Sequence, residues 1–327
     1  MDLTSLRYEI SGSYSLRDFF IYVNLNTKAQ RDADEILKLI LDNKKNVPLF
    51  VHELTHFLES VTTPNGLRLY KCTQHVDATQ LVLIQIAAKM NNGEIRVPLN
   101  KWIREKLDMG VFPEDLWKHY LLALLVQLYH YGSSIYNANL VPCSLWDWPR
   151  NVTLKIDDYV RIEYNAIMRM CYSLFVSDGS GKLRGYHLGS SILREGIAKL
   201  IELGYVRKFF GETAFRRQYA AEYSDPIMLP YYIAFTIFHR FIHNKRLANS
   251  FETFLVLAEA SLLYDFYVCN KKVHRFAPWE IEVHNGWRNW DINPFVVFND
   301  LINKINKDPS SRIALRQQIL SKWRNSG

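Results

Sequence analysis

Two histidines and a glutamate near residue 52 have the types and spacing to bind and use a metal ion. His52, Glu53 and His56 form a His-Glu-x-x-His pattern. In a helix of 3.6 residues per turn, the two histidines lie on the same face, so both imidazoles can reach one ion. Glu53 lies about 100° around the helix, where its carboxylate can contact a water on that ion. The pattern predicts a site at which Zn²⁺, one per chain, and a carboxylate activate water.

The residues around this pattern predict the helix that it needs. Pro48 suits a first helical turn, because the N–H that proline lacks has no helical partner there. Residues 63–66, Thr-Pro-Asn-Gly, are typical of a helix end. We expect Leu54, Phe57 and Leu58 to anchor the helix in a core, so that its polar stripe faces a cleft. The alternative is a partly exposed helix whose histidines only cap or pair with their neighbours.

Two histidines leave a zinc site short of a third protein ligand. Residues 192–202 predict a second helix, on which Glu195 and Glu202 share a face away from the apolar residues. That face could also be a solvated acidic stripe. Asp77, about twenty residues after His56, is the other candidate for the third ligand.

The pairing of His52-Glu53-Leu54-Thr55-His56 with the helix Leu193-Arg194-Glu195-Gly196-Ile197-Ala198 resembles the gluzincin family of zinc metallopeptidases. The resemblance covers about two dozen residues. It implies that His52, His56 and Glu195 bind zinc and that Glu53 is the catalytic base. The spacing from His56 to Glu195, 195 − 56 = 139 positions, is wider than the family pattern. Asp77 therefore stays open as the third ligand. A metzincin site would need a histidine where the chain has Thr62.

The resemblance also implies a tyrosine or histidine that donates a hydrogen bond to the substrate's carbonyl oxygen during hydrolysis. The candidates are Tyr186, His187, Tyr231 and Tyr232. Two further carboxylates could orient the imidazoles from behind. Glu59 shares the stripe of the two histidines, and Glu202 follows Glu195 by nearly two turns. Each of these two glutamates could instead be a plain surface charge.

Composition and charge narrow the function classes. Hydrophobic residues make up 48% of the 327 residues, which indicates a folded protein. The formal charge of +7 is spread along the chain, so we expect no nucleic-acid partner. The four cysteines form no Cys-x-x-Cys pair, and we expect buried thiols in a reducing cell interior. The start lacks the pattern of a secretory signal, and no apolar run approaches the roughly 18 residues of a membrane span. We therefore expect a cytoplasmic protein without a membrane association.

The patterns predict an α+β fold that is predominantly helical. Residues 7–26 alternate in the manner of two strands, so the expected fold is zincin-like with a small N-terminal sheet beside the active-site helix. A further hairpin is expected at residues 172–176 and 183–187. We expect one compact domain over 1–327. Its N-terminal strands and helix occupy 1–45, the metal-site region with a helical insertion 46–205, and a helical part 206–327.

These observations predict an intracellular zinc-dependent metallopeptidase. Its partners would be a protein or peptide substrate and a regulatory protein. One alternative is a zinc hydrolase of a non-peptide amide or ester. Another is a zincin-like module that binds a partner without catalysis, through the aromatic loop 279–290 and the basic C-terminal end. Glu53 argues against this module, because binding zinc requires the histidines but not that carboxylate.

Overall fold

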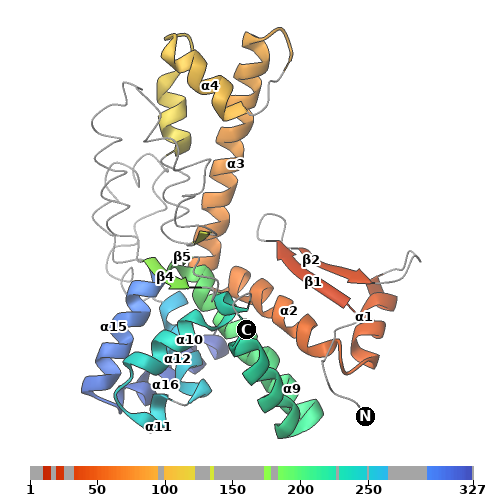
Figure 1. Cartoon of the computed structure of the whole chain (residues 1–327), viewed down its shortest axis with the longest axis vertical. Helices are drawn as coiled ribbons and strands as arrows, with labels where there is room; N and C mark the ends of the chain where they lie inside the picture. Colours follow the sequence, from red (N-terminus) through yellow and green to blue (C-terminus); the bar gives the residue numbers. More distant parts are fainter. Residues whose placement is uncertain are drawn as a thin grey trace. The chain divides into compact units, whose positions relative to one another are not determined.

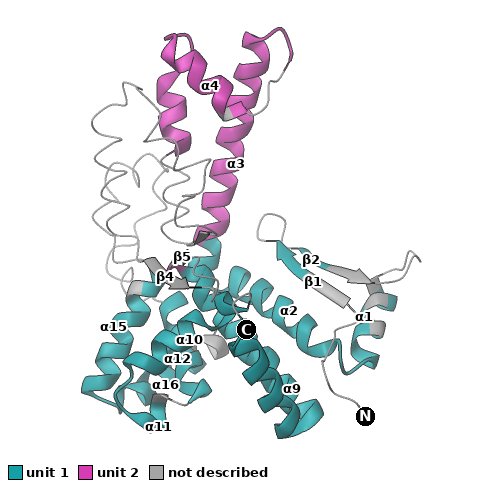
Figure 2. Ribbon diagram, in the orientation of Figure 1, with its two compact units in different colours: residues 1–67, 190–275, 291–327 teal, residues 68–189, 276–290 magenta. Residues whose placement is uncertain are grey.

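The computed structural model is predominantly helical, with small antiparallel sheets (Figure 1). It describes residues 10–15, 20–25, 33–94, 99–121, 133–135, 173–177, 183–225, 228–248, 250–263 and 293–325. The chain forms two compact units (Figure 2). Unit 1 holds residues 1–67, 190–275 and 291–327, and unit 2 holds 68–189 and 276–290. The single domain over 1–327 stays a prediction.

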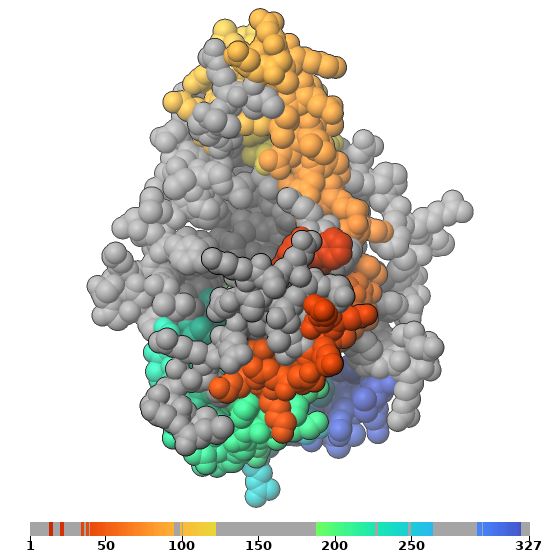
Figure 3. Space-filling model, turned by 90° about the vertical axis from the view of Figure 1, so that its right-hand side faces the viewer, coloured from red at the N-terminus to blue at the C-terminus, as the bar shows by residue number. Residues whose placement is uncertain are grey.

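Unit 1 begins with the expected N-terminal hairpin. Strand β1 (Ile10–Ser15) pairs antiparallel with β2 (Phe20–Leu25), and the register runs from Ile10 opposite Leu25 to Ser15 opposite Phe20. Helix α1 (Ala33–Asp42) follows and lies at the molecular surface in Figure 3. Helix α2 (Val47–Thr62) then carries the His-Glu-x-x-His pattern and packs beside β1. The small sheet beside this helix is therefore confirmed.

Residues 63–66 end α2 and begin α3 (Pro64–Met90), as their types predict. The N–H of Thr63 donates to the Glu59 carbonyl at 3.2 Å and closes α2. The Thr63 hydroxyl then accepts the N–H of Gly66 at 3.0 Å, which satisfies one of the free donors at the start of α3. A Cβ at Gly66 would lie 2.5 Å from the Glu59 carbonyl oxygen, so only glycine fits this close approach.

Helix α9 (Ser190–Tyr223) is the central element of unit 1, and α2, α10 and α12 all pack against it. It extends well beyond the predicted residues 192–202 and kinks at Gly211, whose φ of 86° is outside the helical range. The remaining described helices of the unit are α10 (Leu229–Phe241), α11 (Lys245–Ala248), α12 (Phe251–Leu262), α15 (Pro294–Lys307) and α16 (Ser311–Asn325).

An aromatic core holds the apolar side of α9 in place. Phe235 and Phe238 of α10 contact Phe254 of α12, which in turn contacts Phe298 of α15. The Phe254 ring lies so close to Gly196 of α9 that an added Cβ would meet it at 3.0 Å. Because this side of α9 is fixed by packing, its charged residues are held at defined positions on the other sides.

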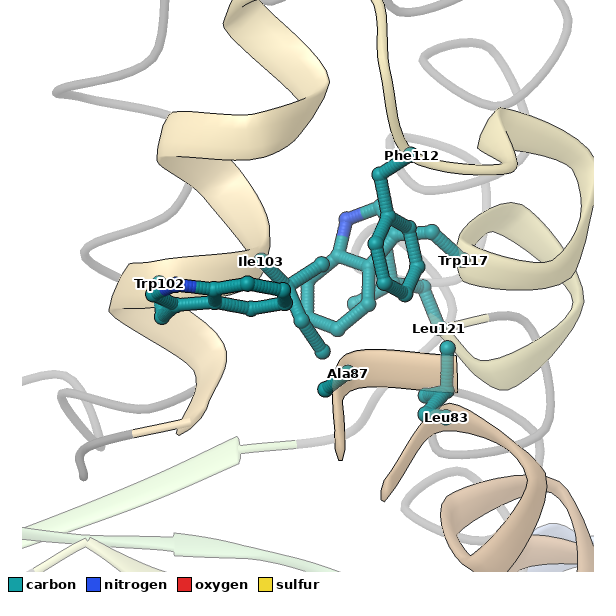
Figure 4. Packing of buried hydrophobic residues seen from close by; sticks show 7 residues of the cluster. All are labelled: Leu83, Ala87, Trp102, Ile103, Phe112, Trp117 and Leu121. Carbon is teal, nitrogen blue, oxygen red and sulfur yellow. The ribbon is translucent and has the colours of Figure 1, made fainter. Parts of the chain in front are cut away.

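Unit 2 contains the rest of α3, α4 (Leu99–Asp108) and a helical segment over 114–121. Their facing sides bury an apolar cluster (Figure 4), composed of Leu83, Ala87, Trp102, Ile103, Phe112, Trp117 and Leu121. The unit also holds a sheet in the order β3-β5-β4, made of β3 (Ser133–Ile135), β4 (Ser173–Ser177) and β5 (Leu183–His187). The predicted hairpin corresponds to β4 and β5, and β3 was not predicted.

One sequence-based expectation about α2 is wrong. Its apolar residues do not form the anchored side, because Leu58 is 45% exposed and Leu54 and Phe57 are only half-buried. The buried side carries both histidines and both glutamates of the helix. Charged partners on α9 offset the free-energy cost of this burial, because charges that are paired and hydrogen-bonded can be taken out of water. None of the described helices has the length and apolar character to cross a membrane.

Candidate metal centre

Three side chains of unit 1 direct one donor atom each toward a common point. His52 Nε2 and His56 Nε2 lie 3.2 Å apart. Glu195 Oε2 lies 3.4 Å from His52 Nε2 and 3.3 Å from His56 Nε2. Among the residues that the structure describes, this is the group of histidine, cysteine and acidic side chains able to hold a metal ion. Two imidazole nitrogens and one carboxylate oxygen thus form a compact triangle compatible with a metal site.

The packing of α2 against α9 produces this triangle. His52 and His56 stand one turn apart on α2, and Glu195 is in the second turn of α9. The histidine side chains are 6% and 10% exposed, whereas that of Glu195 is 31% exposed. The open side of the triangle is therefore the side of Glu195, where a further ligand or a substrate could approach.

Glu202 orients His52 from behind. Its Oε2 lies 3.0 Å from His52 Nδ1, and both side chains are buried. When Nδ1 carries the proton and donates to Glu202, the lone pair of Nε2 is directed into the triangle. Burial alone would raise the pKa of Glu202, but the hydrogen bond to His52 and the charge of Lys199 lower it below its ordinary value. The carboxylate is thus charged and able to accept.

Glu59 and Arg194 hold the second histidine. The guanidinium of Arg194 donates from Nε to Glu59 Oε2 at 3.2 Å and from Nη2 to the His56 carbonyl at 2.7 Å. It also donates to the Ser60 hydroxyl. Glu59 Oε2 lies 3.7 Å from His56 Nδ1, an ion-pair distance and not a hydrogen bond. Arg194 is next to Glu195 in the chain, so it ties the helix of one ligand to the helix of the others.

Glu53 is buried beside the triangle, and it interacts electrostatically with His52, His56 and Glu195. Burial raises the pKa of its carboxyl above the ordinary value, although the two histidines oppose that rise. A backbone hydrogen bond from Tyr14 in β1 reaches the same carboxylate. Burial thus brings Glu53 closer to the proton affinity that a general base needs near neutral pH.

Without a metal, the side chains of His52, His56 and Glu195 form a charged, hydrogen-bonded cluster. Burial would lower the pKa of His56, but the contact with Glu195 and the nearby charge of Glu59 outweigh it and raise the pKa to about 9. Burial would likewise raise the pKa of Glu195, yet the two histidines bring it well below the ordinary range. A protonated imidazole therefore takes the place that a cation could occupy between these donors.

The two tyrosines of α10 occupy different places. The ring of Tyr231 contacts that of His52 edge to face, with centroids 5.6 Å apart. Tyr232 is fully buried in the core, and its hydroxyl donates to Glu222 Oε2 at 2.6 Å. Burial and the nearby carboxylates raise the pKa of Tyr231 to about 12, so its hydroxyl stays protonated as a donor at neutral pH. Of these two, Tyr231 is the one beside the histidines.

The other predicted site residues belong to unit 2. The backbone of Tyr186 and His187 is in β5, and their side chains lie outside the described residues. Asp77 is half-buried in α3. Burial of the phenol raises the pKa of Tyr120, and the charge of Asp77 adds to that rise. The described metal-ligand group contains Glu195 and not Asp77. The aromatic loop 279–290 also lies outside the described residues.

Comparison of the chain with protein-family models, with curated proteins and with solved structures finds no match. The class of site therefore rests on the geometry alone. That geometry defines a group of two buried histidines and a half-buried glutamate with a carboxylate beside it, compatible with binding a metal ion.

Proposed function

We propose that this protein is a zinc-dependent metallopeptidase in which His52, His56 and Glu195 hold the ion. The observation that carries this proposal is the convergence of the three donors beside Glu53. Zinc prefers tetrahedral sites with bonds of about 2.0–2.1 Å to imidazole and carboxylate, so its ligand atoms lie roughly 3.3–3.4 Å apart. The three separations of 3.2, 3.3 and 3.4 Å fit that spacing.

Zinc held there would supply a Lewis acid that polarises a carbonyl group and makes a nearby water more acidic. Glu53 accepts a proton from the water as the oxygen of that water attacks the carbonyl carbon. It then delivers that proton to the nitrogen of the leaving amine as the C–N bond breaks. Tyr231 donates a hydrogen bond from its hydroxyl to the carbonyl oxygen, on which negative charge develops.

The hairpin favours a peptide over other amides as the substrate. Within an antiparallel pair, the backbone groups of successive residues alternate between the partner strand and the free edge. The N–H of Tyr14 reaches Glu53, so it is directed away from β2, and the backbone of Gly12 has the same direction. Of the described strands, only β2 pairs with β1. An extended peptide could therefore pair with this edge at Gly12, two residues before the Tyr14 N–H that donates to Glu53.

Hydrolysis of a mixed peptide library by the zinc-loaded protein tests the proposal. We expect cleavage that a chelator abolishes, and a loss of about 10²–10⁴-fold in kcat/KM for Glu53→Gln, with zinc retained. Glu35→Gln, an exposed glutamate of α1, is the matched control and should keep full activity. Cleavage that survives in Glu53→Gln would refute the catalytic role. Turnover of small esters or amides but not of peptides would indicate the non-peptide hydrolase instead.

A further inference from the structure

Lys199 of α9 is a buried cation behind the metal centre. Its side chain is 3% exposed, and its Nζ lies 2.8 Å from Glu202 Oε1 and 2.8 Å from Glu222 Oε2. Lysine is almost never fully buried unless it is paired, because its ammonium group loses its hydration. Two carboxylates at hydrogen-bonding distance compensate for that loss here.

The contacts of Lys199 lead to His52 by two routes. Glu202 uses Oε1 for Lys199 and Oε2 for His52 Nδ1, so both of its oxygens are engaged and its plane is fixed. Lys199 Nζ also lies 5.8 Å from the ring centroid of Tyr231, and this ring contacts His52 edge to face. The imidazole of His52 is thus held at Nδ1 and against the Tyr231 ring by groups that both contact Lys199.

We propose that Lys199 is a positioning residue of the metal centre, which keeps His52 Nε2 directed at the point shared with His56 and Glu195. This inference rests on the proposed function, because it concerns the affinity of the same site for zinc. Groups that fix the ring of a metal-ligating histidine typically contribute about 10–100-fold to metal affinity. Lys199 acts one contact further out, through Glu202 and Tyr231, and touches neither the ion nor the substrate.

Glu222 separates the positioning role from charge balance. Its Oε2 lies 2.8 Å from Lys199 Nζ and accepts a hydrogen bond from the hydroxyl of Tyr232. Lys199→Met alone would leave two carboxylates without their shared cation, and this variant could fail to fold. The double variant Lys199→Met/Glu222→Gln removes one charge of each sign. Tyr232 can still donate to the amide oxygen of the new glutamine.

The experiment measures zinc affinity by competition with a chromophoric chelator for the wild type, Lys199→Met/Glu222→Gln and Lys208→Met. Lys208 is exposed on the same helix and serves as the matched control. Urea unfolding of the zinc-free proteins reports the stability of each variant separately. In the zinc-loaded proteins, imidazole NMR reports the hydrogen bond that the Nδ1–H of His52 donates to Glu202, which loss of stability alone would not change.

We expect the double variant to bind zinc at least tenfold more weakly than the wild type and to show a weakened hydrogen bond from the Nδ1–H of His52 to Glu202. Lys208→Met should match the wild type in both measurements. Zinc affinity within twofold of the wild type in the double variant would overturn the role of Lys199 and leave the proposed function intact. A wild type that binds no zinc would overturn the proposed function, and this inference with it.

Discussion

The layer between α2 and α9 in unit 1 and the cluster of α3, α4 and 114–121 in unit 2 are both buried, but they contain opposite kinds of side chain. The first buries charged groups, among them Glu59, Arg194, Lys199 and Glu202. The second buries leucine, isoleucine, alanine and aromatic rings (Figure 4). Apolar burial stabilises a fold by about 25 cal/mol per Å². Burying a charged group costs several kcal/mol of free energy, and pairing with an opposite charge offsets part of that cost.

This difference indicates where function is to be sought. A layer of paired charges is no more stable than well-packed apolar residues of the same volume would be. Its presence around three converging atoms that could ligate a metal is therefore better explained by the chemistry of the site than by stability. The apolar cluster has packing as its sufficient explanation.

Arg194→Met should give the largest loss. It leaves Glu59 buried without its cation and removes the contact to the His56 carbonyl. We expect the free energy of unfolding in urea to fall by roughly 3–5 kcal/mol, and zinc affinity to fall as well. Arg217→Met, at an exposed position of the same helix, should stay within about 0.5 kcal/mol of the wild type. Unchanged zinc affinity in a folded Arg194→Met protein would count against a link between this layer and the site.

Trp117→Ala should lower the free energy of unfolding by a similar or slightly smaller amount, without any effect on zinc affinity. Trp117 is 4% exposed and packs near Tyr120, so its removal leaves a cavity in the cluster. The expected loss is about 3–5 kcal/mol in the free energy of unfolding. The control is Met109→Ala, since Met109 is 64% exposed in the same unit. A fall in zinc affinity of tenfold or more in Trp117→Ala would break the division between the two regions.

The pH dependence of the free energy of unfolding should distinguish the two regions without any mutation. His56 has its pKa raised from 6.5 to about 9 in the metal-free protein. Its contribution to stability is therefore fully present below pH 6.5 and is lost as the pH rises through about 9. The expected loss is on the order of 3 kcal/mol. The apolar cluster has no titrating member and should add no such slope.

Urea unfolding at several pH values, with chelator and with zinc, measures this change. In the zinc-loaded protein both histidines are neutral ligands, so the decline between pH 6.5 and 9 should disappear. Zinc binding should also tighten as the pH rises, because fewer protons have to be displaced. A metal-free protein that is equally stable at both ends of this range would contradict the charged cluster.

Much of the site follows from local sequence rules. The spacing of His52 and His56, the proline in the first turn and the breakers at 63–66 are local features, and the structure agrees with each. Asn293 likewise caps α15 through its side chain, which accepts the N–H of Phe295 at 2.9 Å. These features depend on residues within a few positions of one another, so a pattern in the chain is enough to find them.

The residues that hold the two histidines from behind, Arg194 and Lys199, could not be predicted from local sequence patterns. Arginine and lysine are exposed in most helices, and nothing local distinguishes Arg194 and Lys199 as buried. Lys199 and Glu202 are spaced i, i+3, a pairing that is equally common on a solvated face. The partners of Arg194 on α2 are 134 to 138 residues away. Only the packing of α2 on α9 shows that the polar side of α2 faces inward.

Metal content measured by mass spectrometry on the purified, zinc-reconstituted protein tests whether His52 and Glu195 hold zinc. The wild type is compared with His52→Ala, Glu195→Ala and Asp77→Ala. We predict about one zinc per chain in the wild type and in Asp77→Ala, and loss of zinc in His52→Ala and Glu195→Ala. A wild type without zinc would contradict the proposed zinc site. Zinc that survives in Glu195→Ala but is lost in Asp77→Ala would also contradict it.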